Sequence, residues 1–374
     1  MEFEHMADSG IVDFGNLHRI GKTMKKAMSG EEITVGMIGG SITQGSLSST
    51  PKTCYAYLVY EWWVRRFPGS KVHYINAGIG GTSSHFGAAR VVEDLLVHQP
   101  DFVITEFSVN DSNTPFFKET YEGLIRRILT HEAEPGVLIL NNVFYKDGTN
   151  AQEMHNEVGA FYGLPMVSIK DSLYRLVEAG EILKEDITPD DLHPNDAGHK
   201  LVADIVTHML DWIYKKVIKE EADKDYILPK ETLTANRFED SLRLNNRNSQ
   251  PAAKGFEIDN AAQEKITDIF RNGWSAGRIG DTISFEVEAG NIAVQYKKTV
   301  KRQAPVATVI VDKDMDNQIV LDANFEEDWG DCLYLQNLLT GGEKKKHTLD
   351  ITITQADEKS NLDFYLVSII ISDR

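Results

Sequence analysis

The chain of 374 residues has few cysteines, no excess of basic residues and no long apolar run. Its two cysteines, Cys54 and Cys332, lie in different halves, so no disulfide framework is built and a reducing compartment is compatible. The net charge of −18 argues against a nucleic-acid partner, which requires clustered lysine and arginine. Neither a membrane-spanning run nor a signal peptide is found. We therefore expect a cytoplasmic protein without a nucleic-acid or membrane partner.

Motifs for cofactors and metals are also missing. The complete phosphate-loop pattern does not occur, and no Cys/His grouping has the spacing of a zinc site. Gly78-x-Gly80-x-x-Ser83 matches a dinucleotide fingerprint only in part, because it follows the second expected strand and lacks the third glycine. The sequence therefore predicts no cofactor and no metal.

The first two-thirds of the chain alternates apolar, β-branched runs with amphipathic segments. We expect strands at 33–38, 71–76, 102–107, 137–140 and 165–169 and helices at 17–30, 55–67, 84–98, 117–131, 151–162 and 196–219. Repeated strand–helix units with apolar strands predict an α/β fold, a doubly wound, flavodoxin-like parallel sheet covered on both faces.

The last third has another pattern. A charged connection at 219–230 is followed by short, alternating segments expected to be strands, at 281–288, 292–296, 307–311, 319–321, 347–354 and 364–371. Short strands with turn signals and almost no helix predict an all-β, antiparallel jelly-roll sandwich. We expect an α/β domain at 1–222 and a β-sandwich domain at 231–374.

Polar residues and glycines follow several of the expected parallel strands, and such loops meet at one edge of the sheet. Acyl transfer needs a nucleophile, a base, a group that orients the base, and donors for the developing oxyanion. We expect Ser41 to be the nucleophile, His193 the base and Asp190 the group that orients it. The backbone N–H groups of Ser41 and Gly81 and the side-chain amide of Asn110 are the expected oxyanion donors.

Each of these residues has a purely structural alternative. Ser41 could cap a helix, Gly81 could only make a turn, and Asn110 could close an Asx-turn. Asp191 is adjacent to Asp190, although the spacing of three residues before the histidine favours Asp190.

The same residues resemble the four sequence blocks of the SGNH hydrolases, the esterase superfamily also called GDSL. The blocks are Gly39-Gly40-Ser41-Ile42, the stretch 76–82, Val109-Asn110-Asp111 and Asp190-x-x-His193. The resemblance covers roughly residues 30–220. It departs at Gly40, where the family usually has Asp, and at Ser108-Val109, where paired glycines are commoner. Both departures change the floor beside the acyl group and so bear on substrate preference.

The last third is similar, in pattern only, to β-sandwich modules that accompany carbohydrate-active enzymes. Trp274 and Trp329 lie in loop-like contexts, where an aromatic face could stack on a sugar ring. The alternative is that each tryptophan fills the core of the sandwich or the seam between the domains. Gln44 and His85, close to the expected site, complete the candidate substrate-binding residues. A calcium site in the sandwich has no supporting ligand spacing.

The two-domain arrangement resembles carbohydrate acetyl esterases that act on plant hemicellulose. This resemblance implies a serine esterase that removes O-acetyl groups from oligosaccharides, with β-mannan favoured over xylan, through an acetyl-enzyme. An esterase for lipids or a thioesterase for acyl-CoA is one alternative, and a non-catalytic glycan-binding protein is another. We also expect the sandwich domain to cover one side of the Ser41 cleft. The sequence leaves a homo-oligomer open.

Overall fold

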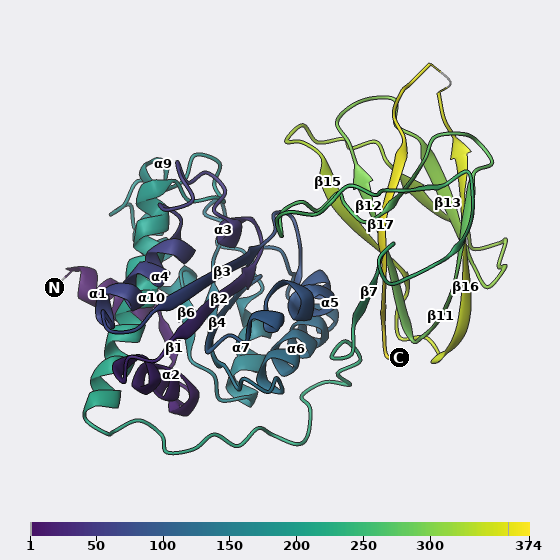
Figure 1. Cartoon of the computed structure of the whole chain (residues 1–374). Coiled ribbons are helices and arrows are strands. Elements are labelled where there is room, and N and C mark those ends of the chain that lie inside the picture. Colours follow the sequence, from purple (N-terminus) through teal and green to yellow (C-terminus); the bar gives the residue numbers. More distant parts are fainter. Residues whose placement is uncertain (1, 358) are drawn as a thin grey trace. The chain divides into compact units, whose positions relative to one another are not determined.

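The computed structural model describes residues 2–357 and 359–374 and divides the chain into two compact units (Figure 1). The first unit ends at Asn236, and the second spans Arg237–Arg374. Each unit is built around its own hydrophobic core. Among the described residues, no helix has both the length and the apolar character that crossing a membrane requires.

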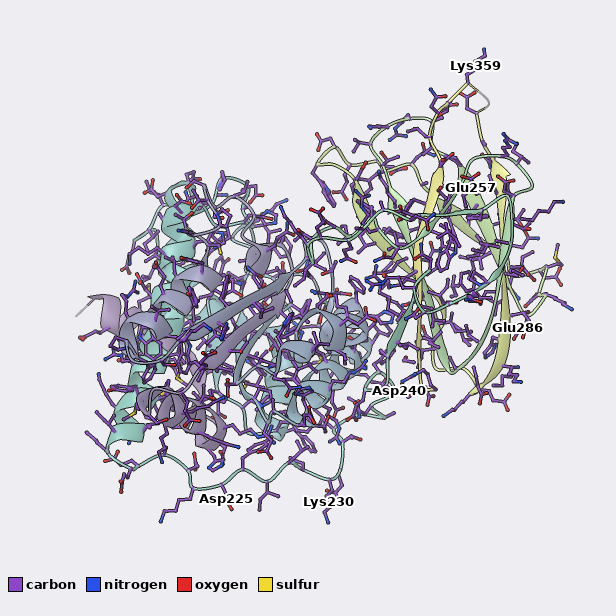
Figure 2. All side chains as sticks on the ribbon, viewed as in Figure 1. Asp225, Lys230, Asp240, Glu257, Glu286 and Lys359 are labelled. Carbon is purple, nitrogen blue, oxygen red and sulfur yellow. The ribbon has the colours of Figure 1, made fainter. Side chains whose placement is uncertain are left out.

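The segment that connects the expected domains belongs to the first unit. The backbone N–H of Leu17 donates to the carboxylate of Asp223, at 2.7 Å. The buried carboxylate of Glu122 accepts the backbone N–H groups of Leu233, at 2.6 Å, and Thr234, at 2.7 Å. These hydrogen bonds explain why the first unit extends to residue 236, beyond the connection at 222–231 that separates the expected domains. Figure 2 labels two side chains of this segment, Asp225 and Lys230, both of which are exposed.

The first unit contains a six-stranded sheet in the order β1-β6-β5-β4-β2-β3. Five strands are parallel: β2 (Ile33–Gly39), β3 (Val72–Gly78), β4 (Phe102–Glu106), β5 (Gly136–Asn141) and β6 (Met166–Ser168). Their order confirms the predicted flavodoxin-like, doubly wound sheet. The short strand β1 (Ile11–Asp13) pairs antiparallel with β6 and was not predicted, because three half-exposed residues carry no apolar pattern.

Helices cover both faces of this sheet, as Figure 1 shows. On one face, α10 (Asp196–Ile218) packs against α1 (Glu2–Ser9), α2 (His18–Met28) and α4 (Tyr55–Arg66). The other face is covered by three helices, of which the middle one, α6 (Pro115–Leu129), packs against both α5 (Ser84–Asp94) and α7 (Gln152–Phe161). Strand β4 is buried along its whole length. This explains why its sequence begins with consecutive apolar residues and does not alternate between polar and apolar residues. The short helices are α3 (Ser41–Gln44), α8 (Arg175–Glu178) and α9 (Lys184–Ile187).

The second unit consists of two sheets of antiparallel strands that share one apolar core. One sheet contains β15 (Cys332–Leu339), β12 (Asn291–Lys298), β17 (Phe364–Ser372), β10 (Trp274–Ala276), β9 (Glu257–Ile258) and β7 (Leu242–Leu244). The other contains β14 (Ile319–Asp322), β13 (Val306–Val311), β16 (Lys345–Gln355), β11 (Thr282–Ala289) and β8 (Ala252–Lys254). Alternate residues of β11 are buried from Ile283 to Ala289, as the sequence pattern predicted.

The expectation that Trp274 lies in a loop is wrong. This residue begins strand β10, pairs with Leu366 of β17 and is only 2% exposed. Its ring packs edge-on against Phe285, with the ring centroids 5.4 Å apart. Because the ring has no open face, the prediction that it stacks on a sugar fails and the alternative, a core-filling role, holds. Trp329 does lie in a loop, and it is 57% exposed.

Candidate active site

Ser41 follows strand β2 after one intervening residue, Gly40, and is the first residue of the short helix α3. Two glycines allow this helix to approach the strand ends. A Cβ atom on Gly39 would lie 2.2 Å from Thr43 Oγ1, and one on Gly78 would lie 2.2 Å from the backbone nitrogen of Gln44. Side chains at either position would push α3 away from the sheet. The serine is therefore held at the carboxyl edge of the sheet, as expected.

The structure brings Ser41, His193 and Asp190 into one hydrogen-bonded chain. His193 Nε2 lies 2.8 Å from Ser41 Oγ, although the two residues are 152 positions apart. On the other side of the ring, His193 Nδ1 lies 2.6 Å from Asp190 Oδ2. A base in this position can take the serine proton while the carboxylate holds the ring in the required tautomer.

The second oxygen of Asp190 fixes the carboxylate itself. Asp190 Oδ1 accepts the backbone N–H groups of His193, at 2.7 Å, and Leu192, at 3.1 Å. Partial burial disfavours the ionised form, but the hydrogen bonds from His193 and Leu192 outweigh it and lower the pKa of Asp190. The neighbouring Asp191 is engaged elsewhere, because its Oδ1 lies 2.7 Å from the ammonium of Lys184. This geometry favours Asp190 over Asp191 as the partner of the histidine.

The expected oxyanion donors border the same turn. Gly81 has a φ of +68°, in the left-handed region that favours glycine, and lies in the loop after β3. The predicted substrate-binding residue Gln44 anchors this loop, because its Oε1 accepts the backbone N–H of Gly80 at 2.6 Å. The side chain of Asn110 packs against Gly40. The loop after β3 and the turn after β4 thus both reach the Ser41 turn.

A buried pair that sequence reasoning missed lies behind Asn110. Asp111 Oδ2 is 3.0 Å from His155 Nε2, and both side chains are completely buried. Asp111 Oδ1 accepts the backbone N–H of Ser84, which starts α5 shortly after Gly81. One carboxylate therefore connects the two loops that carry the expected oxyanion donors. The sequence shows Asp111 beside Asn110, but it does not show that the partner of Asp111 is His155 on α7, 44 residues away.

Two further buried charged groups support the strand ends. Arg90 is completely buried and donates to the carbonyl oxygens of Ala77, at 2.8 Å, and Gly39, at 3.1 Å. Glu106, at the end of β4, accepts a hydrogen bond from Thr43 Oγ1 at 3.2 Å. Burial raises the pKa of Glu106 to about 7, against the opposing effect of hydrogen bonds from Asn142 and Thr43. Arg90 and Glu106 each stand alone as a charged residue within an apolar stretch, and this is the sequence signal that could have identified them as buried charges.

Two histidines near the expected site have no base-like geometry. His85, a predicted substrate-binding residue, is 3% exposed and packs edge-on against Phe116. Burial lowers its pKa to about 4, so its ring is neutral at physiological pH. His199 accepts the backbone N–H of Tyr55 and faces the carbonyl oxygen of Ser46, at 3.3 and 3.2 Å. Its pKa is also lowered to about 4 by burial. In this structure His85 packs against an aromatic ring, and His199 bonds to backbone groups.

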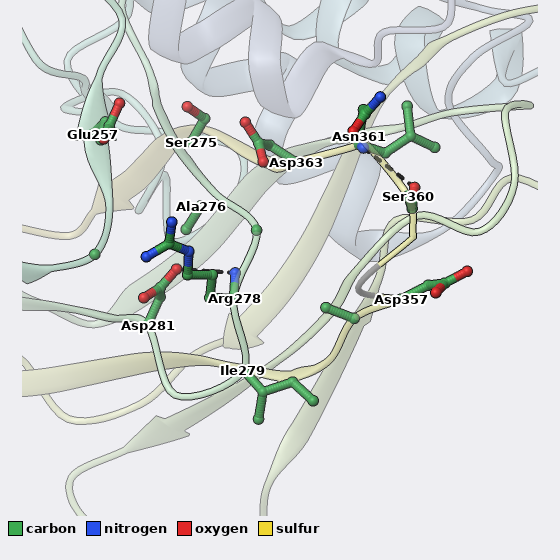
Figure 3. A pocket seen from close by; sticks show the side chains of 14 residues that line it. Glu257, Ser275, Ala276, Arg278, Ile279, Asp281, Asp357, Ser360, Asn361 and Asp363 are labelled. Atoms are coloured by element: carbon green, nitrogen blue, oxygen red, sulfur yellow. Dashed lines mark hydrogen bonds between the residues drawn. The ribbon is translucent and has the colours of Figure 1, made fainter.

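The second unit has a separate pocket of about 850 Å³ between β9, β10 and the loop residues 277–281, 356–357 and 360–363 (Figure 3). Figure 3 shows the carboxylates of Glu257, Asp281 and Asp363 around it, with the side chain of Arg278 beside Asp281. Its lining contains no histidine or cysteine. Among the described residues, no group of three or more acidic, histidine or cysteine side chains has the arrangement of a metal site. The pocket therefore contains no histidine that could act as the base in acyl transfer.

Comparison with known proteins agrees with this geometry. Residues 37–201 match the GDSL-like Lipase/Acylhydrolase family, a range that contains every expected catalytic and oxyanion residue. The chain is 50% identical to a two-domain esterase active on acetylated mannans, solved with mannopentaose, with 98% of this chain and 97% of that one aligned and a TM-score of 0.93. A second structure described as a two-domain esterase active on acetylated mannans aligns with a TM-score of 0.94, at 50% identity and 98% coverage of both chains.

An acetylxylan esterase from Geobacillus stearothermophilus is also similar, at 29% identity over 208 residues. The alignment covers 93% of that protein but only 48% of this chain. The alignment with the acetylated-mannan esterase thus covers both units. The alignment with the acetylxylan esterase covers 208 residues, which is about the length of one unit.

Proposed function

The chain belongs to the GDSL-like lipase/acylhydrolase family, the SGNH hydrolases, and from this premise we propose that it removes acetyl groups from mannan oligosaccharides with Ser41 as the nucleophile. It is a carbohydrate acetyl esterase. The observation that carries the choice of mannan is the likeness at 50% identity across both units to an esterase active on acetylated mannans. The xylan-active relative is less similar and lacks a counterpart for about half of the chain.

In the proposed mechanism, Ser41 Oγ attacks the acetyl carbonyl while His193 Nε2 takes its proton, over a hydrogen bond that already measures 2.8 Å. Asp190 stabilises the imidazolium that forms. The carbonyl oxygen becomes an oxyanion and accepts hydrogen bonds from the backbone N–H groups of Ser41 and Gly81 and from the Asn110 amide. Collapse expels the sugar oxygen, which takes the proton from His193.

The second half of the reaction hydrolyses the acetyl-enzyme. Water attacks the ester carbon, His193 Nε2 takes one of its protons, and the same donors hold the second oxyanion. Breaking the bond to Ser41 Oγ releases acetate, and His193 returns the proton to the serine. Apart from the substrate and water, the proposed steps use only side chains and backbone groups of the chain, and none of them calls for a metal or a cofactor.

The second unit is proposed to be a carbohydrate-binding module that contacts the sugar chain. Its exposed Trp329 supports this role, since an aromatic face complements the C–H face of a sugar ring. A cytoplasmic location is also proposed, supported by two cysteines that are both free and buried. Fractionation of the source cells with an antibody would test the location, and a signal in the extracellular fraction would refute it.

The decisive experiment measures acetate release from matched panels of acetylated manno- and xylo-oligosaccharides, with the positions of the remaining acetyl groups determined by NMR. We expect a higher kcat/KM on the mannan series. Equal or better turnover of the xylan series would contradict the proposed substrate. Acetyl and octanoyl aryl esters, run alongside, distinguish the lipid or acyl-CoA alternative, because a long acyl chain needs an apolar channel. Absence of any hydrolysis would favour a non-catalytic glycan-binding protein.

A further inference from the structure

Gly40 separates the last residue of β2 from the nucleophile. Its backbone has φ −87° and ψ −149°, and a negative φ does not itself require glycine. Its N–H donates to the carbonyl oxygen of Glu106, at 3.2 Å, so the residue is fixed to the neighbouring strand β4. Backbone conformation therefore does not explain why a glycine stands where related proteins usually have Asp.

The space around Gly40 does explain it. A Cβ atom built on Gly40 would lie 2.0 Å from Asn110 Oδ1 and 2.9 Å from Asn110 Cγ. Both distances are shorter than real Cβ contacts, so the Asn110 amide occupies the volume that any side chain at position 40 would need. The amide nitrogen Nδ2 lies further away, 3.4 Å from the same point. The oxygen end of the amide is thus packed against Gly40, and the donor end points away from it.

Little else fixes the amide. Asn110 Oδ1 is buried, and among the described residues it has no hydrogen-bond partner. The backbone of Asn110 is held, because its N–H donates to Phe107 O at 2.9 Å. The orientation of the side chain consequently depends on packing, and the backbone of Gly40 is part of that packing.

We propose that Gly40 is a positioning residue for the oxyanion site: the missing side chain lets the Asn110 amide pack against the backbone beside Ser41 and present its N–H group to the oxyanion. This inference rests on the proposed role of Asn110 as a donor. It also means that Gly40→Asp, although it restores the residue usual in the family, would displace Asn110 in this chain. In this proposal Gly40 acts through Asn110.

A double-mutant cycle tests the inference, with Gly40→Ala, Asn110→Ala and the double variant assayed on an aryl acetate. Asn110→Ala should lower kcat by about 100- to 1000-fold, as loss of one oxyanion donor does. We expect Gly40→Ala alone to lower kcat at least 10-fold with little change in KM. In the Asn110→Ala background the same change should lower kcat less than 2-fold, because the group that it displaces is gone.

The control is Gly69→Ala, since a Cβ atom there meets nothing within 4 Å. It should leave kcat and KM unchanged. An equal loss from Gly40→Ala in both backgrounds, or no loss in the wild-type background, would overturn the inference and leave the role of Asn110 intact. Wild-type kcat in Asn110→Ala would instead refute the donor role and the inference with it.

Thermal unfolding of wild type, the two single variants and the double variant tests the contact between Gly40 and Asn110 independently of activity. We expect Gly40→Ala to lower Tm and the added Asn110→Ala change to restore part of the loss, because it removes the atoms that clash. If Gly40→Ala does not fold, a folded double variant still supports the contact. A double variant that also fails to fold, beside a folded Asn110→Ala, would overturn it.

Discussion

The edge of the parallel sheet around Ser41 and the pocket of the second unit both gather polar and acidic side chains, but they differ in how those groups are held. At the sheet edge, hydrogen bonds join residues far apart in the chain, such as Ser41 with His193 and Asp111 with His155. In the pocket, the hydrogen bonds made by the side chains of lining residues are local, as from the backbone N–H of Arg278 to the carboxylate of Asp281 at 3.0 Å. Long-range bonds fix a reacting geometry, whereas local bonds only shape a loop.

The carboxylates of the two regions show the same difference electrostatically. Asp190 accepts hydrogen bonds from three N–H groups, and its pKa is lowered. Burial raises the pKa of Asp363, and the charges of Glu257 and Asp281 raise it further. The first carboxylate is prepared to stabilise a cation beside it, and the second faces like charges without such a partner. A carboxylate can therefore orient and stabilise an imidazolium only where hydrogen-bond donors keep it ionised, as they do at Asp190.

Removing the nucleophile should have the largest effect. Ser41→Ala should reduce kcat on an aryl acetate and on acetylated manno-oligosaccharide by at least about 10,000-fold, since no other group can form the acetyl-enzyme. Ser48→Ala is the matched control, because the Ser48 hydroxyl only donates to the carbonyl oxygen of Gly45. Turnover by Ser41→Ala within 10-fold of wild type, measured after purification from a host without esterase background, would refute the mechanism.

The adjacent aspartates provide the next test. Asp190→Asn keeps the size of the side chain but removes the charge beside His193, so kcat should fall by roughly 100- to 10,000-fold. Asp191→Asn should stay within about 3-fold of wild type, because Asp191 pairs with Lys184 on the protein surface and a residue with φ +64° tolerates Asn. Steady-state kinetics of the two variants decide the assignment, and a reversed order would transfer the orienting role to Asp191.

Glu106 is an exception to this difference between the two regions. It is a carboxyl group of the first unit, at the end of β4, and its pKa is also raised. Its folded pKa of about 7 exceeds the usual 4.5, so the folded state binds the proton more tightly. The stability that this proton contributes is complete below pH 4.5 and is lost as the pH rises to about 7. Glu106→Gln should therefore gain about 3 kcal/mol relative to wild type between pH 4 and pH 8.

Urea unfolding of wild type and Glu106→Gln at several pH values measures this difference. Glu61→Gln is the control, because the Glu61 carboxylate lies on the surface and pairs with Arg65. A stability difference between wild type and Glu106→Gln that does not change with pH would show that the Glu106 carboxyl group does not take up a proton in this range.

Trp329 tests whether the second unit contributes to recognition. Its ring is exposed, lies edge-on to Phe325 and donates its N–H to Glu327 at 2.5 Å. Trp329→Ala should raise KM for acetylated manno-oligosaccharide by roughly 2- to 10-fold, the value of one aromatic contact, and leave KM for an aryl acetate unchanged. Met315→Ala, which removes another exposed apolar side chain of the same unit, should change neither. Equal changes on both substrates would count against a sugar-binding role.

The smallest effect is expected in the pocket of the second unit. Asp363→Asn removes one of the like charges there, so Tm should rise by up to about 2 °C at pH 7, with no change at pH 3, where the carboxyl group is protonated. Activity on an aryl acetate should not change. Asp316→Asn, at an exposed position in the same unit, should leave Tm unchanged at both pH values. A lower Tm for Asp363→Asn would mean that its carboxylate has a stabilising partner.

The comparison also explains which features the sequence could reveal. Alternating strands and helices leave a periodic signal, and Ser41, Gly81, Asn110 and His193 stand at strand ends where topology alone brings them to one edge. The partners of buried charges leave no such signal. His155 meets Asp111 only because α7 packs against β5 and β6, and Arg90 reaches two carbonyl oxygens only because α5 packs against β2.

Trp274 was mispredicted for a related reason. The stretch Asn272-Gly273-Trp274-Ser275 has the composition of a turn, but a three-residue strand needs only partners on both sides, which β9 and β17 provide. The role of Gly40 was not predictable either, because a glycine in a sequence does not show which atom occupies the space of its missing side chain.

The segment of the first unit that follows α10 and ends at Asn236 has a consequence for how such proteins exchange modules during evolution. Because Glu122 and Leu17 bond to residues of that segment, the α/β unit is complete only with a tail that extends to Asn236. A recombination event that cut at the end of α10 would leave the Glu122 carboxylate buried without its backbone donors. Productive fusions of this unit to other modules should therefore retain the whole tail, so crossover points are expected beyond it.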